Sequence, residues 1–199
     1  MNLIDFDPSL NILPCDGEAS YFGSILSHRD TDYYLEHLLD SIRWENDQVL
    51  IYGKRIITKR KVAWYGDSDY AYTYSNVTKH ALGWTRELTD LKDIVEDITD
   101  TDFNSCLLNL YHDGDEGVGW HSDDETALGE NPIIASLTFG AERKFSLKHK
   151  VNKQVVSLTL ESGSLFVMKG KTQSNWVHCL PKMKGISTAR INLTFRRYR

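Results

Sequence analysis

Apolar residues recur at helical spacing in two segments of the first half of the chain. In residues 31–43, three leucines and Ile42 fall on one helical face, and Thr31 ahead of them has the side chain of an N-cap. Residues 84–99 show the same spacing of leucine, valine and isoleucine. Both segments are therefore predicted to be amphipathic helices that pack one face against the rest of the protein.

Short segments rich in β-branched and aromatic residues make up most of the remaining chain, separated by Gly, Asn, Asp or Pro. The predicted strands are residues 49–57, 61–65, 105–111, 133–139, 144–148, 155–160, 164–168 and 189–197. In the last strand Ile191, Leu193 and Phe195 alternate with polar residues, so only one of its faces is expected to join the core. Two helices and many antiparallel strands indicate an α+β domain with a β-sandwich or jelly-roll body.

Length and cysteine content narrow the class of protein. A chain of 199 residues suits one domain, and three cysteines outside any CxxC pair argue against a disulfide scaffold or a structural zinc site. No apolar run is long enough to cross a bilayer, and the first residues lack a secretion signal. We therefore expect a monomer without membrane partners, located in the cytoplasm, or in the nucleus of a eukaryote.

The net charge of -5 argues at first against a nucleic-acid partner. However, residues 1–40 hold eight acids and one arginine, so the rest of the chain is net positive. Residues 49–61 carry five basic residues and no acid, and residues 62–76 carry four tyrosines. Such a pair of segments is typical of phosphate contact and base stacking. The alternative is an ordinary hairpin with aromatic cross-strand pairs. A weaker lysine cluster at residues 148–153 is interpreted as a solvated turn.

Three residues have the spacing of a metal site. His121 and Asp123 are two apart, so an extended backbone points both to one side, and His178 follows much later. Two histidines and one carboxylate form the facial triad of non-haem Fe(II), which leaves coordination positions open for oxygen chemistry. Since His-x-Asp is common by chance, surface histidines remain an alternative. Residues 113–118 lack the ligand pattern of a calcium loop, and no nucleophile elbow, Walker loop or dinucleotide fingerprint occurs.

Two arginines add a second ligand chemistry. Arg190 and Arg196 share the polar phase of the last strand, and a guanidinium fork can hold a carboxylate by two hydrogen bonds. Beside a metal, a buried arginine suits a dicarboxylate co-substrate, which Asn109 and Tyr111 on an earlier strand could also reach. The alternative is a solvated basic C-terminus, which does not explain the shared phase.

Taken together, these segments resemble the AlkB family of Fe(II)- and 2-oxoglutarate-dependent nucleic-acid dealkylases. The resembling segments are NLY at 109–111, GWHSDDE at 119–125, PIIASLTFG at 132–140, GSLFVMKG at 163–170, WVH at 176–178 and RxNxTxR at 190–196. Order and spacing match over about residues 50–199, and the DNA-repair homologues of the duplex-DNA and single-strand types look most similar.

The resemblance implies an α+β fold built on a double-stranded β-helix, a jelly-roll relative. The N-terminal helices would pack on one sheet, and residues 49–80 would form a nucleotide-recognition lid. Residues 1–48 would be an acidic segment and helix of the same domain, and residues 49–199 the dioxygenase domain.

The resemblance also implies the site residues. Fe(II) would be bound by His121, Asp123 and His178, with 2-oxoglutarate and O2 as co-substrates. The residues implied to hold 2-oxoglutarate are Asn109, Tyr111, Arg190, Asn192, Thr194 and Arg196. The residues implied to contact substrate are Tyr52, Gly53, Lys54, Tyr72, Tyr74, Asp124 and Glu125. Among these, Tyr52 would be a finger inserted into the base stack, and Tyr74 would stack on the flipped base.

The function implied is direct-reversal repair by oxidative dealkylation of 1-methyladenine and 3-methylcytosine. The partner would be alkylated DNA, single- or double-stranded, with RNA second, and the products formaldehyde, succinate and CO2. One alternative keeps the oxygenase chemistry but acts on a protein or small molecule. Another is a metal-stabilised nucleic-acid-binding module without turnover. We expect Trp44, Trp84 and Trp120 in the core or the pocket wall.

Overall fold

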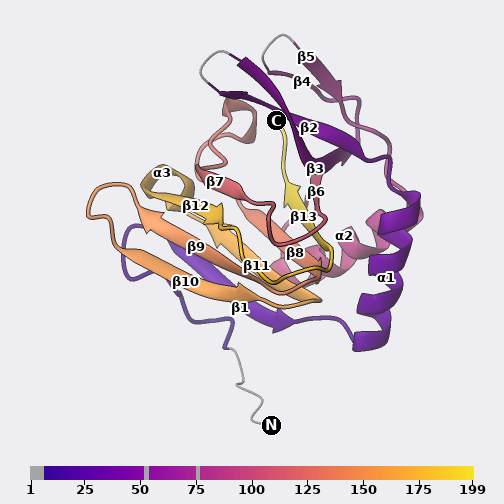
Figure 1. The fold of residues 1–199 in the computed structure, drawn as a ribbon. Coiled ribbons are helices and arrows are strands. Elements are labelled where there is room, and N and C mark those ends of the chain that lie inside the picture. Colours follow the sequence, from indigo (N-terminus) through magenta and orange to yellow (C-terminus); the bar gives the residue numbers. More distant parts are fainter. Residues whose placement is uncertain (1–6, 52–53, 75–76) are drawn as a thin grey trace.

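Two antiparallel sheets face each other in the computed structural model, which describes residues 7–51, 54–74 and 77–199 (Figure 1). The larger sheet has the strand order β1 (Glu18–Ser24), β11 (Ser164–Lys169), β8 (Ile134–Gly140), β13 (Arg190–Arg196), β6 (Ser105–Tyr111), β3 (Lys54–Gly66) and β2 (Glu45–Ile51). The smaller sheet has the order β10 (Val155–Leu160), β9 (Arg143–His149), β12 (Trp176–Leu180) and β7 (Val118–His121). Strands β4 (Ala71–Tyr74) and β5 (Val77–His80) pair with each other. This is the predicted α+β sandwich.

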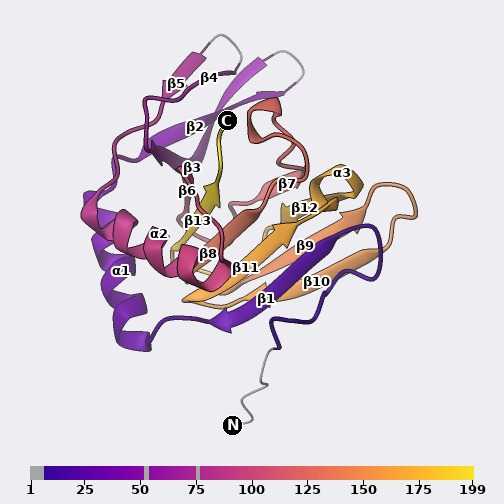
Figure 2. The same cartoon turned by 180° about the vertical axis from the view of Figure 1, so that it is seen from behind.

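Helices α1 (His28–Ser41) and α2 (Arg86–Thr99) cover the outer face of the larger sheet (Figure 2). Their buried leucines and valine pack on the apolar residues of β6, β8 and β13. Helix α1 begins earlier than predicted: Ser27 is its N-cap and accepts from Asp30 N at 3.2 Å. The expected cap, Thr31, lies inside the first turn, where its hydroxyl donates to the Ser27 carbonyl at 2.9 Å. A short helix, α3 (Thr172–Asn175), precedes β12, and a 3-10 turn spans Thr126–Leu128.

The last strand separates core from site as predicted. Ile191, Leu193 and Phe195 of β13 are fully buried in the core under the helices. The polar residues of the same strand face the smaller sheet and line a cavity. A second apolar cluster, which includes Phe166 and Trp176, closes the sandwich at the β1 side. The fold therefore presents one polar stripe of the larger sheet to the gap between the sheets.

Most predicted strands lie within two residues of the observed ones, and residues 105–111 and 155–160 match fully. Residues 49–57 were wrongly predicted as one strand. The backbone reverses there, since β2 ends at Ile51, β3 begins at Lys54 and the two are paired antiparallel. Strands β1, β4, β5, β7 and β12 were not predicted. In the part of the chain that the structure describes, no helix is long and apolar enough to span a membrane.

Candidate active site

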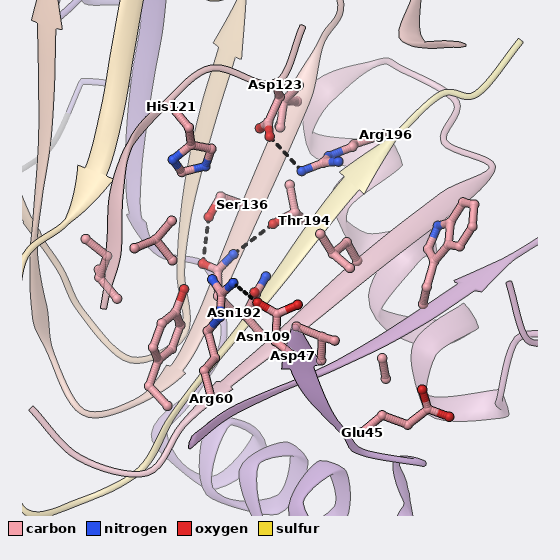
Figure 3. A pocket seen from close by; sticks show the side chains of 18 of the residues that line it. Glu45, Asp47, Arg60, Asn109, His121, Asp123, Ser136, Asn192, Thr194 and Arg196 are labelled. Atoms are coloured by element: carbon pink, nitrogen blue, oxygen red, sulfur yellow. Dashed lines mark hydrogen bonds and ion pairs between the residues drawn. The ribbon is translucent and has the colours of Figure 1, made fainter. Parts of the chain in front are cut away.

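A cavity of about 610 Å³ opens between the two sheets beside the β2–β3 hairpin. Its walls come from β6, β8 and β13 on one side and from β7, β9 and β12 on the other. Figure 3 shows His121 and Asp123 at one end and Asn109, Asp47 and Arg60 at the other, with the polar residues of β13 between them. The cavity is therefore polar along one wall and continuous from end to end.

Strand register brings the three predicted metal ligands together. His178 of β12 pairs directly with His121 at the end of β7, and their ring centroids are 4.3 Å apart. Asp123 follows two residues after β7, and its Oδ2 lies 3.8 Å from His178 Nε2. One ligand atom from each residue lies within 4.8 Å of the others. This is the compact two-histidine, one-carboxylate cluster that a single Fe(II) ion requires.

Burial and neighbouring charges set the protonation states of His178 and Asp123. Burial lowers the pKa of His178 to about 4, although Asp123 opposes the shift, so the imidazole is neutral at pH 7. Burial alone would raise the pKa of Asp123, but Arg196, with both histidines, outweighs it and holds the pKa below the usual range. A neutral imidazole and an ionised carboxylate are the protonation states that metal ligands need.

Two neighbours fix the position of Asp123. Arg196 donates from Nη2 to Asp123 Oδ1 at 2.8 Å. Gln173 of α3, 2% exposed, accepts the Asp123 backbone N–H at 2.9 Å through Oε1, and its Nε2 faces the sulfur of Met168 at 3.4 Å. Gln173 was not predicted, because nothing in its local pattern separates it from other polar residues near a helix end.

The polar face of β13 forms a hydrogen-bonded ladder with β8. Asn192 Oδ1 accepts from Arg190 Nη2 and from Ser136 Oγ, each at 2.8 Å, and Asn192 Nδ2 donates to Thr194 Oγ1 at 2.9 Å. Thr138 accepts from Arg190 Nη2 at 3.0 Å. The ladder thus joins three predicted co-substrate residues to two residues of β8 that were not predicted. The sequence did indicate these two residues, because alternation in residues 134–140 places Ser136 and Thr138 on the strand face opposite to that of the buried Leu137.

The arginine at the deep end of the cavity has no anionic partner among the described residues. Arg190 is 2% exposed, and among the described residues no carboxylate lies within ion-pair distance of it. Its Nε, like that of Arg196, lacks a hydrogen-bond partner. Burial lowers the pKa of Arg190 to about 10. Because a buried charge without a counter-ion is costly, this end of the cavity fits the carboxylate of an added ligand such as 2-oxoglutarate.

The other predicted co-substrate residues surround this arginine. The ring of Tyr111 lies 5.5 Å from the Arg190 guanidinium carbon, and Asn109 faces Asn192 across the β6–β13 pair. Both are buried and line the cavity. All six predicted co-substrate residues are therefore brought to one wall.

An ion pair that was not predicted closes the far end of the cavity. Arg60 Nη2 contacts Asp47 Oδ2, with side chains only 16% and 14% exposed, and the guanidinium carbon lies 5.9 Å from the Tyr111 ring. Burial opposes the charged form, yet Tyr111 and Asp47 together raise the pKa of Arg60. The expected phosphate contact by the whole basic run is therefore wrong for Arg60, which faces inward, while Lys54 and Lys59 are exposed.

The predicted substrate residues fall into three groups. Glu125 lines the cavity, with Oε1 at 3.4 Å from Arg196 Nη1, whereas Asp124 is exposed and outside the cavity lining. Lys54 is exposed at the start of β3. The remaining predicted residues are not described: Tyr52 and Gly53 lie outside the described residues, and so do the side chains of Tyr72 and Tyr74 on β4.

A family model described as the 2OG-Fe(II) oxygenase superfamily matches residues 18–196, which include every residue that lines the cavity except Tyr198. This chain belongs to that superfamily. It is 38% identical over 178 residues to "Alpha-ketoglutarate-dependent dioxygenase alkB homolog 3" of Homo sapiens, covering 84% of this chain and 62% of the relative. It is 39% identical over 158 residues to "DNA oxidative demethylase ALKBH2" of Homo sapiens, covering 75% and 60%. The chain thus spans about three fifths of the length of these relatives.

Structural similarity agrees with this assignment. The solved structure titled "The structure of OsALKBH1" superposes with a TM-score of 0.65 at 16% identity, covering 90% of this chain and 97% of the other. At that identity the match shows the fold alone. The family match confirms the predicted membership of the Fe(II)- and 2-oxoglutarate-dependent oxygenases. The structural match agrees with the predicted α+β fold of two antiparallel sheets. The two relatives are named as proteins of the predicted AlkB type.

Proposed function

We propose that this protein removes alkyl groups from N-alkylated nucleic-acid bases by AlkB-type oxidation. The observation that carries the proposal is the continuity of one cavity, which joins a compact metal cluster to a buried arginine without a counter-ion. Two similar proteins named as an alkB homolog and a DNA oxidative demethylase support the choice of substrate class. The proposed substrates are 1-methyladenine and 3-methylcytosine in single- or double-stranded DNA, with RNA second.

The residues take distinct roles in this proposal. His121, Asp123 and His178 hold Fe(II), which supplies oxidation of the methyl C–H bond with O2 when 2-oxoglutarate is bound. Arg190 receives the distal carboxylate of the co-substrate, and Arg196 keeps Asp123 ionised and in place. The methyl group leaves as formaldehyde, and 2-oxoglutarate is converted to succinate and CO2.

The remaining ladder residues orient the co-substrate. Asn192 and Thr194 already share hydrogen bonds along β13, so each presents a fixed polar atom to the cavity. Asn109 and Tyr111 oppose them from β6. This arrangement supports binding of 2-oxoglutarate with its distal carboxylate towards Arg190, because its oxygens then meet donors already held in place.

We also propose that residues 49–80 act as a lid over the base, within one domain formed by residues 1–48 and 49–199. Glu45, Gln48 and His80 line the same cavity as the metal cluster, which supports a substrate path past both hairpins. The lid residues proposed to contact substrate are Tyr52, Gly53, Lys54, Tyr72 and Tyr74. On the opposite side Glu125 would accept from the exocyclic amino group of the base, with Asp124 nearer the strand.

Formaldehyde release from methylated oligonucleotides tests the proposal. The wild type should release formaldehyde in proportion to succinate, and Asp123→Ala should abolish both. Asp115→Ala, which alters an exposed carboxylate in a nearby loop, serves as the matched control and should retain activity. If no oligonucleotide yields formaldehyde while 2-oxoglutarate is still consumed, a protein or small-molecule substrate replaces the nucleic acid. If 2-oxoglutarate gives no visible charge-transfer band with Fe(II) under anaerobic conditions, the oxygenase proposal itself fails.

A further inference from the structure

An exposed tryptophan lies directly before the first metal ligand. On β7, His121 turns towards the cavity, whereas Trp120 turns to the outer face of the smaller sheet and is 44% exposed. The expectation of a core or pocket-wall position for Trp120 is therefore wrong.

Two lysines extend the same outer face. Lys148 of β9 places its ammonium 4.2 Å from the centroid of the Trp120 ring, reaching across β12 to do so. Lys144 lies four residues earlier on β9, so its side chain shares this face with Lys148. In the described part of the chain, neither lysine takes part in an ion pair. The two cations are thus available to an external anion.

Strand β10 adds only uncharged side chains to this face in the part of the chain that the structure describes. Strand β10, at the edge of the sheet, contributes the exposed residues Val155, Ser157 and Thr159, whose register partners on β9 are Lys148, Ser146 and Lys144. A protein of net charge -5 therefore presents, next to its catalytic cavity, a sheet face with two unpaired cations and one exposed indole. Anionic strands with stackable bases match this combination of groups.

We propose that Trp120, Lys144 and Lys148, here called the outer-sheet face, bind the nucleic-acid strand that flanks the base in the cavity. A flanking base stacks on Trp120, and the adjoining phosphates pair with the lysines. When a base stacks on Trp120, the Lys148 ammonium leaves its cation–π contact with the ring and pairs with a phosphate. The base–indole contact is stronger than the exposed cation–π contact that it replaces. The proposal rests on the proposed function, because it needs a base in the cavity to bring the strand past β7.

Substrates of different length distinguish binding at the outer-sheet face from binding in the cavity. A methylated trinucleotide fills the cavity but ends near β7, whereas a substrate of about fifteen nucleotides reaches the outer face. Trp120→Ala should lower kcat/KM on the long substrate about five- to tenfold more than on the trinucleotide. Trp120→Phe should recover most of that difference. Tyr33→Ala, which removes a 54% exposed aromatic from α1, is the matched control and should leave the ratio as in the wild type.

A binding measurement tests the outer-sheet face without turnover. A variant at Lys148 tests it without changing the residue next to His121. Fluorescence anisotropy of a labelled, unmodified oligonucleotide should show weaker binding by Trp120→Ala. Lys148→Gln, which is remote from the metal ligands in the sequence, should reduce the slope of log K against log salt by about one phosphate contact. The proposal is overturned if Trp120→Ala affects both substrate lengths by the same factor, or if Lys148→Gln leaves the salt slope unchanged.

Failure of the proposed function can be distinguished from failure of the outer-sheet face. If methylated oligonucleotides are not turned over but the unmodified strand binds and both variants weaken it, the outer-sheet face stands and the reaction assignment falls. If the wild type binds no oligonucleotide, the outer-sheet face is refuted as well. If turnover is intact and the variants bind as the wild type does, only the outer-sheet face is lost.

Discussion

Replacing Gln173 with methionine should loosen the metal site without changing any of its ligands. The side chains are similar in size. The change removes the Oε1 that accepts the buried Asp123 N–H at 2.9 Å, and with it the Nε2 contact to the Met168 sulfur at 3.4 Å. Leaving a buried donor unsatisfied costs about 1–3 kcal/mol. For a domain of this size, that loss lowers the Tm of the metal-free protein by about 2–12 °C.

The effect on metal affinity follows separately. Asp123 would keep its ion pair with Arg196 but lose the anchor on its backbone, so its carboxylate is less well positioned for the metal. Loss of a supporting residue of this kind typically costs 10–100-fold in metal affinity. We therefore expect the Fe(II) concentration for half-maximal activity to rise by about that factor, and Co(II) titration followed by its visible spectrum to shift in parallel.

Gln154→Met provides the control for this substitution. Gln154 is exposed in the β9–β10 turn, and in the described part of the chain its side-chain amide makes no hydrogen bond, so neither Tm nor metal affinity should change. Gln173→Glu retains an acceptor and should keep part of the backbone anchor. If Gln173→Met lowers Tm but leaves Co(II) affinity as in the wild type, Gln173 supports the fold alone and the positioning argument is refuted.

Three further changes have outcomes of definite sign. Arg190→Met should raise the KM for 2-oxoglutarate at least thirtyfold yet raise the Tm of the co-substrate-free protein, because it removes a buried charge without a counter-ion. For His178, whose pKa falls from 6.5 to about 4 on folding, the unfolded chain binds more protons between these values. Stability of the metal-free protein should therefore fall as pH drops from 6.5 towards 4, and His178→Asn should flatten that part of a Tm–pH curve. Asp47→Ala should destabilise by about 3–5 kcal/mol in urea unfolding, because it leaves Arg60 unpaired, and the Asp47→Ala/Arg60→Met double variant should recover most of the loss.

Local periodicity was enough to predict the wall that carries the co-substrate residues. In β13 every second residue is apolar over seven positions, so the phase of Arg190 and Arg196 could be read from the chain alone. Strands β7 and β12 could not be predicted in the same way. Each has only four or five residues, and their pairing is irregular between His178 and Leu180. Such strands are defined by their partners rather than by their own pattern.

Hydrogen bonds between residues far apart in the chain could not be predicted from the sequence either. Gln173 and Asp123 are fifty residues apart, and their hydrogen bond depends on where α3 lies against the loop after β7. Nothing local to either residue marks it as a partner of the other. The motif therefore predicted the three candidate metal ligands that the fold brings together, but not the residue that holds one of them in place.

The direction in which a charge faces was the hardest property to predict. Arg60 belongs to the most basic stretch of the chain, yet it turns inward to Asp47, while Lys148, which was interpreted as part of a solvated turn, lies over an exposed indole. Alternation along a strand predicts which side chains share a face. Whether that face is buried or exposed depends on the layer that packs against it. The smaller sheet packs its inner face on the cavity, so its outer face takes Trp120 and Lys148 out to solvent. Net charge and basic runs therefore did not indicate the surface beside β7, which could be recognised only when the strand order was known.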